Sequence, residues 1–288
     1  MVYAMLSSAT FGLIPLFTLP VIKSGMHTPS IIFYRMLFSV AMLAVLIFIR
    51  RESFRISGKQ LKTIFFLSIF YAATSLLLVE SYLYIPSGLA TTISFLYPIA
   101  VTLILFFCFG QRVSASTLVA ILLSFAGVFL LSSKSASGSL DGRGLLCVII
   151  TVFTYSTYIV GMNKSCVNSL SSLVLSFYVL LFTTLFFTVN MSLQGGLESI
   201  PGIKELGSLL LLGFIPTVLS NIFLFLALKR IDSATTSLFG CMEPLTALLV
   251  GYFVFGEEML WLQILGAAII IAAVLMVVLQ TFKDNSRE

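Results

Sequence analysis

The sequence is poor in charged residues and has a single histidine. Only 9% of its 288 residues are Asp, Glu, Lys or Arg, whereas a typical soluble domain has about 25%. Hydrophobic residues make up 59% of the chain, and the mean hydropathy is +1.12. One soluble core cannot hide so much apolar surface, so lipid must cover the rest. An integral membrane protein is therefore expected.

The missing residue types also exclude several kinds of chemistry. His27 is the only histidine and falls in a predicted loop, which removes Ser-His-Asp and Cys-His catalysis and His-rich metal sites. No aspartate lies inside a predicted span, and there is no GxxxxGK[ST] phosphate loop. The basic residues punctuate short loops, so nucleic acid is not an expected partner. We expect no enzyme activity, cofactor or metal.

A spanning helix needs about 20 mostly apolar residues. Ten such stretches are found, which predicts an all-α integral membrane fold with ten transmembrane helices. The strands of a membrane barrel would alternate polar and apolar residues, and these stretches do not. The predicted spans are 2–22, 30–49, 62–84, 88–109, 113–132, 143–163, 169–192, 206–228, 233–255 and 260–281.

The basic residues in the loops predict the orientation. Connections on the N-terminal side hold eleven Lys and Arg residues, and those on the opposite side hold four. Because cytoplasmic loops carry the excess of basic residues, both termini are expected in the cytoplasm and the chain in the cytoplasmic (inner) cell membrane. An even number of spans is then required, and ten satisfies it.

Part of the sequence recurs 146 residues later. The first copy includes Ile85, Ser87, Pro98 and Phe109-Gly110, and the second includes Ile231, Ser233, Pro244 and Phe255-Gly256. We therefore divide the chain into a first five-helix repeat (1–134), a second repeat (140–282) and a short cytoplasmic tail (283–288). An odd number of spans per repeat makes the repeats inverted, an arrangement that builds one site opening alternately to either side.

Three ionisable residues fall inside predicted spans, where a charge costs several kcal/mol unless it faces protein or water. They are Arg35, Glu80 and Glu243. Arg35 and Glu80 lie at similar depth near the outer ends of their spans, so we expect them to pair. Such a pair either contacts substrate or only ties two helices together.

Glu243 lies near the middle of its span, directly before Pro244, and no basic residue of neighbouring spans is expected at its depth. Its counterpart in the first repeat is Tyr97, directly before Pro98. Paired interruptions near the midplane indicate a transporter's binding site, with the prolines as hinges. Burial favours a neutral carboxyl at Glu243, which could bind a cation, a substrate amine or a proton. Alternatively, it is a protonated side chain that bonds a neighbouring helix.

Uncharged candidates are weaker. Five residues could line a cavity with polar tips, although ordinary packing between helices is the simpler interpretation of each. They are Tyr34, Tyr82, Tyr155, Tyr158 and Asn221. Small residues at Ala120/Ser124 and Ala268/Ala272 have the spacing that lets helices approach closely. They predict tight packing or a homodimer face.

Several motifs resemble the drug/metabolite transporter (DMT) superfamily, in particular EamA-type transporters with two inverted five-helix repeats. They are Tyr34-Arg35-Met36, Ala227-Leu228-Lys229-Arg230-Ile231, Met242-Glu243-Pro244, Phe255-Gly256-Glu257-Glu258 and Gln263-Ile264-Leu265-Gly266-Ala267. The resemblance covers essentially the whole chain. Two positions depart from the family pattern, with Gln111 in place of the usual acidic residue and Glu80 at a normally uncharged position. The resemblance implies a carrier with a central cavity and with the fifth and tenth helices at the periphery.

The resulting hypothesis is a secondary transporter that exports a small metabolite, such as an amino acid or a drug-like compound, by alternating access. The site candidates are Glu243 and Tyr97 near the midplane, with Arg35 and Glu80 further out. The partners expected are a small-molecule substrate and the lipid bilayer. An uncoupled facilitator or channel for small solutes is the alternative, and a membrane enzyme is disfavoured by the missing catalytic groups.

Overall fold

A computed structural model describes residues 1–81, 84, 90, 93–111, 115–131, 141–193, 196–255 and 260–285. All regular secondary structure in those ranges is helical. Six helical stretches among them are long and apolar enough to cross a membrane, and three apolar helices are shorter. The all-helical fold is thus confirmed and suits a membrane protein, whereas the number of ten spans stays a prediction.

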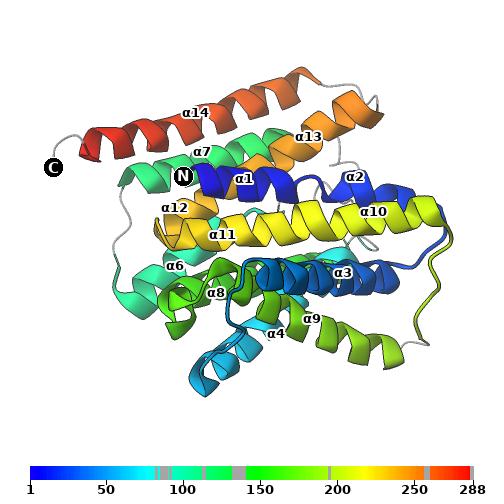
Figure 1. Ribbon diagram of the computed structural model, residues 1–288. Helices are drawn as coiled ribbons and strands as arrows, with labels where there is room; N and C mark the ends of the chain where they lie inside the picture. Colours follow the sequence, from blue (N-terminus) through cyan, green and yellow to red (C-terminus); the bar gives the residue numbers. More distant parts are fainter. Residues whose placement is uncertain are drawn as a thin grey trace.

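The first half of the chain has its helices where the sequence predicts spans one to five (Figure 1). The first predicted span is broken after ten residues, at Gly12 and Leu13, and resumes with Pro15 in the first turn of the next helix. The helices are α1 (Val2–Phe11), α2 (Ile14–Lys23), α3 (Thr28–Ile49), α4 (Gly58–Ser81), α6 (Tyr97–Phe109) and α7 (Ala115–Leu131).

The second half is more irregular. Its eighth predicted span contains one π-helical turn, and its ninth contains a short 3₁₀ turn. The elements are α8 (Gly142–Lys164), η2 (Cys166–Ser169), α9 (Ser172–Leu193), α10 (Ile203–Gly213), η3 (Phe214–Leu219), α11 (Ser220–Leu228), α12 (Ser233–Leu238), η4 (Phe239–Cys241), α13 (Met242–Phe255) and α14 (Trp261–Asn285).

Local sequence accounts for several helix ends. The Asp141 carboxylate accepts the Arg143 backbone N–H at 2.7 Å and caps α8. Asp232 caps α12 in the same way by accepting the Thr235 backbone N–H at 2.9 Å. At the end of α6, Gly110 has φ +62°, a left-handed conformation that glycine adopts without the steric penalty of a Cβ.

The packing between the two halves repeats when the halves are exchanged. α1 of the first half packs on α11 of the second half. The corresponding pair with the halves exchanged is α8 with α4, and these two helices also pack together. Likewise α3 packs on α10, and α4 packs on α9. α3 with α9 and α7 with α14 are pairs of corresponding spans. Two repeats related by a pseudo-twofold axis would produce this pattern, and the division into repeats stays a prediction.

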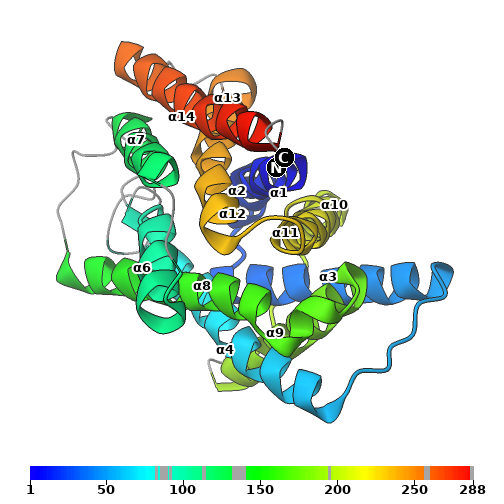
Figure 2. The ribbon, with the colours of Figure 1, turned by 90° about the vertical axis from the view of Figure 1, so that its left-hand side faces the viewer.

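α7 and α14 lie side by side along one edge of the bundle (Figure 2). α14 carries large apolar side chains that are exposed, including Trp261, Ile264 and Ile271. The pair is peripheral, as the family resemblance implies for the fifth and tenth spans. The first helix begins and the last helix ends toward the same end of the bundle (Figure 1), as an even number of spans requires.

Candidate functional site

The fourth and ninth predicted spans are both interrupted at the residues that the repeat analysis selects. α6 begins at Tyr97, just after the turn that contains Leu96, and Pro98 lies in its first turn. α13 begins at Met242 directly after η4, so Pro244 also lies in a first helical turn. Proline suits this position because its missing N–H would have no intrahelical acceptor there. The interruptions are present as expected, and flexing at the prolines stays a prediction.

Tyr97 is held where the two interrupted spans cross. It is 7% exposed, and its hydroxyl donates to the Ser237 carbonyl of α12 at 3.0 Å. Its own carbonyl accepts the Ser156 hydroxyl of α8, also at 3.0 Å. A Cβ at Gly240 would lie 1.6 Å from the Tyr97 hydroxyl oxygen. Only glycine therefore lets the ring pass over η4.

Tyr97 and Glu243 line the same small cavity. The cavity lies between α1, α6, α8, α11, α12 and α13, so helices from both halves form its wall. One carboxyl, several hydroxyls and three aromatic rings face a small volume. The lining residues are Ala4, Ser7, Ser8, Phe11, Tyr97, Tyr155, Ile159, Ser220, Leu224, Thr236, Ser237 and Glu243.

A group of tyrosines stands on one side of the cavity. The rings of Tyr97 and Tyr155 meet edge to face with their centroids 4.9 Å apart. Tyr158 stacks behind Tyr155 at 6.3 Å, and Tyr71 lies 5.1 Å from Tyr158. Tyr155 therefore lines the cavity as the sequence suggests, whereas Tyr158 is fully buried and forms a second layer.

The expected pairing of Arg35 with Glu80 is wrong, since no ion pair joins these two described residues. The Arg35 guanidinium donates from Nε to Thr217 Oγ1 of η3 at 2.6 Å and lies over the Phe11 ring, 5.6 Å from its centroid. Depth alone suggested the pair, but α3 packs on α9, α10 and η3, whereas α4 packs on α8 and α9. The Arg35 guanidinium is directed instead toward η3 and toward Phe11 of α1.

Arg35 and Glu243 are both close to Phe11. Phe11 lines the same cavity as Glu243 and lies under the Arg35 guanidinium. Arg35 itself is not among the residues that line the cavity. The roles of both side chains in binding stay predictions.

The remaining candidates lie elsewhere. Tyr34 donates its hydroxyl to the Glu198 carbonyl at 2.8 Å, at the end of the bundle away from the cavity. Glu80 is half-buried in the last turn of α4. Asn221 is buried and donates to the Thr217 carbonyl at 2.8 Å, which supports the π-helical turn. Tyr82 lies outside the described residues.

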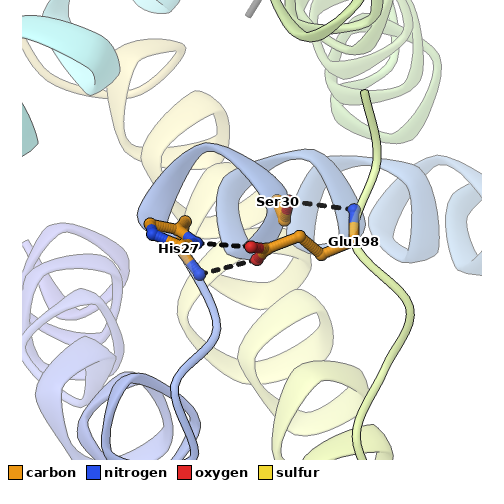
Figure 3. Close-up of polar contacts among 3 residues, drawn as sticks. All are labelled: His27, Ser30 and Glu198. Carbon is orange, nitrogen blue, oxygen red and sulfur yellow. Dashed lines mark hydrogen bonds and ion pairs between the residues drawn. The ribbon is translucent and has the colours of Figure 1, made fainter. Parts of the chain in front are cut away.

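A polar link joins the two halves near Tyr34 (Figure 3). The His27 backbone N–H donates to the Glu198 carboxylate at 2.7 Å, and the His27 ring Nδ1 contacts the other carboxylate oxygen. The Ser30 hydroxyl accepts the Glu198 backbone N–H at 3.4 Å. These hydrogen bonds from His27 hold the pKa of Glu198 below its ordinary value. The link ties the turn between α2 and α3 to the segment before α10.

Sequence reasoning missed the contribution of α1. Ser7, Ser8 and Phe11 line the cavity, but serine and phenylalanine in an apolar span carry no distinctive signal. A Cβ at Gly12 would lie 2.5 Å from the Glu243 carbonyl oxygen, so this glycine brings α1 against α13.

The small residues serve internal packing in α7. Ala120 and Ser124 are completely buried within the chain, whereas Ala268 and Ala272 of α14 are exposed. A Cβ at Gly127 would lie 2.8 Å from the Gly266 carbonyl oxygen, so α7 and α14 approach closely there. The homodimer stays a prediction.

These features define the class: a multi-pass helical membrane protein with a small polar and aromatic cavity between its two halves. A profile of the EamA-like transporter family matches residues 1–133 and again 142–279. The chain belongs to the EamA-like transporter family.

The relatives agree with this assignment, and a solved structure shares the fold. An uncharacterized transporter of Archaeoglobus fulgidus is 26% identical over 277 residues, which is 94% of this chain and 93% of the relative. A second one from the same organism is 24% identical over 227 residues, or 78% and 80% of the two chains. A crystal structure with 16% identity has a TM-score of 0.82 and covers 98% of this chain and 97% of its own. The protein is a membrane transporter, and the solved structure shares its fold.

Proposed function

We propose that the protein is a secondary transporter that exports a small metabolite, such as an amino acid or a drug-like compound, by alternating access. The two repeats, residues 1–134 and 140–282, would rock about the cavity between them. The two stretches matched by the family profile and the exchange pattern of helix packing support this division. Membership of a transporter family supports the absence of an enzymatic role.

One observation carries the proposal: the two interrupted spans present Tyr97 and Glu243 to one cavity. Interrupted helices leave backbone groups free to bind solutes, and their breaks can flex without unfolding the span. Glu243 is the one cavity-lining residue with an ionisable carboxyl. It is our candidate for binding a proton or a substrate ammonium.

The position of the cavity supports export. Its α1 residues lie near the start of the first span, and its α11 residues lie near the end of the eighth. If both termini face the cytoplasm of the cell membrane, as the basic loops predict, the cavity lies nearer the cytoplasmic surface. The His27–Glu198 link lies at the opposite end. We therefore propose that this conformation loads its cargo from inside the cell.

The test is flux of a metabolite panel in proteoliposomes, with and without a pH gradient. The wild-type protein should show saturable flux that is stimulated by substrate on the far side. Glu243→Gln should reduce that flux roughly 10- to 100-fold, as expected for the loss of a charged contact. Glu205→Gln is the control, because that carboxylate lies in the first turn of α10 away from the cavity.

Two results would count against the proposal. Flux that neither saturates nor responds to trans substrate indicates an uncoupled facilitator. A Glu243→Gln protein with wild-type rate and pH dependence removes this carboxyl from the transport cycle.

A further inference from the structure

Glu52 and Glu198 are matching carboxylates in the segments that follow α3 and α9. They lie 146 residues apart, which is the spacing at which the repeated sequence recurs, so each occupies the position of the other. α3 and α9 are corresponding spans that pack against one another. Both glutamates are partly buried. The chain therefore places an equivalent acidic residue after each member of this helix pair.

Glu198 contacts the beginning of α3 (Figure 3). Its carboxylate accepts the His27 backbone N–H at 2.7 Å, and the other carboxylate oxygen contacts the His27 ring. Two turns further along α3, the Tyr34 hydroxyl donates to the Glu198 backbone carbonyl at 2.8 Å. The segment after α9 is thus held at two points by the first turns of α3.

Glu52 makes equivalent contacts at the other end of the pair. Its carboxylate accepts the hydroxyl of Ser171, the residue directly before α9, and we call this contact the Ser171–Glu52 link. Seven residues later, the Tyr178 hydroxyl of α9 donates to the Phe54 backbone carbonyl at 2.8 Å. The segment after α3 is therefore held at two points by the first turns of α9.

The two links match in register as well as in kind. Tyr34 lies seven residues after His27, and Tyr178 lies seven residues after Ser171. Seven residues are about two helical turns, so in both helices the tyrosine and the first contact lie on one face. Each link is what the other becomes when the two halves are exchanged.

These links cross between the halves at opposite ends of the helix pair. Halves that rock about a central site separate at one end while they close at the other, so the link at the separating end must break. The contacts are polar and lie at or near the surface, with the His27 side chain 80% exposed. Water can replace hydrogen bonds of this kind at small net cost. Such contacts can open and re-form in every cycle.

We propose that the Ser171–Glu52 link and the His27–Glu198 link are the two latches of the transport cycle and open in alternation. This inference rests on the proposed transport function and assigns residues that hold each side closed. Both links are formed in this structure. In the predicted orientation the Ser171–Glu52 link faces the cytoplasm, so its release is the first step of export.

The experiment measures the side from which the cavity can be reached. In a protein freed of its four cysteines, Ser8→Cys in the cavity wall is labelled by a membrane-impermeant thiol reagent added to one side at a time. The measured quantity is the ratio of the two labelling rates. It requires no knowledge of the substrate.

The two glutamates should shift this ratio in opposite directions. Glu198→Gln weakens the link where α3 begins and should raise relative labelling from that side roughly 2- to 10-fold, the effect of weakening one hydrogen-bonded contact. Glu52→Gln should raise it from the other side by a similar factor. The double variant should return toward the wild-type ratio because the two changes offset one another. Glu205→Gln is the matched control, since this carboxylate lies in the first turn of α10 and belongs to neither link.

The tyrosines provide a second pair of variants. Tyr34→Phe removes the hydrogen bond to the Glu198 carbonyl, and Tyr178→Phe removes the one to the Phe54 carbonyl. Each should shift the labelling ratio in the direction of the glutamate variant at its own end, by a smaller factor. They decide the question if a glutamate variant fails to fold.

Contacts that only tie the two helices together would lower stability without favouring either side. The inference is overturned if the folded variants keep the wild-type ratio, or if changes at the two ends shift it in the same direction. Saturable flux in proteoliposomes would in that case leave the proposed transport function standing. Opposite shifts in a protein that carries no metabolite of the panel would instead leave the latches standing and remove the transport function.

Discussion

The two interrupted spans use the same backbone device with different side chains. In both, a new helix begins with a proline in its first turn, at Pro98 in α6 and at Pro244 in α13. The residue before the proline is Tyr97 in the first half and Glu243 in the second. Tyr97 is a neutral donor already engaged with Ser237, whereas Glu243 brings a titratable carboxyl to the cavity. The repeat therefore preserves the break in the helix and varies its chemistry.

A second contrast lies in the spans that cross the centre. α4 and α8 run without interruption for 24 and 23 residues. The counterpart of α8 in the first half is the first span, which is broken at Gly12. The counterpart of α4 in the second half is the eighth span, which is distorted into a π-helix at Phe214–Leu219. α8 contributes Tyr155 and Ile159 to the cavity wall, but the broken or distorted spans supply three of its four serines, Phe11 and the Thr217 support for Arg35. In these described spans, the irregular backbone therefore lies around the polar cavity.

The largest expected effect is a loss of transport, and it should differ between Glu243 and its counterpart Tyr97. Glu243→Gln should lower transport roughly 10- to 100-fold, and Tyr97→Phe should lower it about 2- to 10-fold, because it removes one neutral hydrogen bond. Initial rates in proteoliposomes measure both. Equal losses for the two variants would break the contrast between an ionisable and a neutral half-site.

The crossing of Tyr97 over η4 can be tested through stability. Gly240→Ala places a Cβ against the Tyr97 hydroxyl and should destabilise the protein by about 1–3 kcal/mol, the usual cost of overpacking. Gly207→Ala is the matched control, since nothing lies within 4 Å of a Cβ there, and it should be neutral or slightly stabilising. Thermal unfolding in detergent compares them, and an unaffected Gly240→Ala protein would show that Tyr97 is not held as described.

The π-helical turn offers a smaller test. Thr217→Val removes both the acceptor for Arg35 and the bond to the Leu212 carbonyl, so we expect a loss of about 1–2 kcal/mol of stability. In Thr157→Val only an intrahelical bond to Phe153 is lost. The control should therefore change the unfolding temperature less. The reverse order would mean that η3 is not held by Arg35.

The smallest effect is expected at the His27–Glu198 link. Because the pKa of Glu198 is lowered in the folded protein, its contribution to stability is present above the unfolded-state pKa and is lost as pH falls through the lower folded value. The difference in unfolding temperature between wild type and Glu198→Gln should shrink over that acidic range. A difference that stays constant down to the most acid conditions tolerated would contradict the link.

Much of the fold could be predicted from the sequence because bilayer thickness imposes a length on every span. The repeat spacing and the prolines also located Tyr97 and Glu243, since a proline marks its own break in the helix. The Arg35–Glu80 pair was wrong for a physical reason. Counting residues gives the depth of a side chain along the membrane normal but not the direction in which it leaves its helix.

The polar wall from α1 could not be predicted either. Serine and threonine in a membrane helix usually bond their own backbone, as Thr10 does to Leu6 and Ser7. Their presence therefore does not identify a cavity. Ser7 and Ser8 acquire meaning only when α1 is seen between α11 and α13.

The most direct test is thiol labelling of a single cysteine in the cavity wall. In a protein freed of Cys108, Cys147, Cys166 and Cys241, Ser8→Cys is exposed to a membrane-impermeant reagent added to one side at a time, with Phe253→Cys on the exposed apolar surface as the control. We predict that Ser8→Cys reacts from either side, with a side preference that substrate shifts, while Phe253→Cys stays unlabelled. A Ser8→Cys protein that transports normally yet never reacts from either side would contradict a transport path through this cavity.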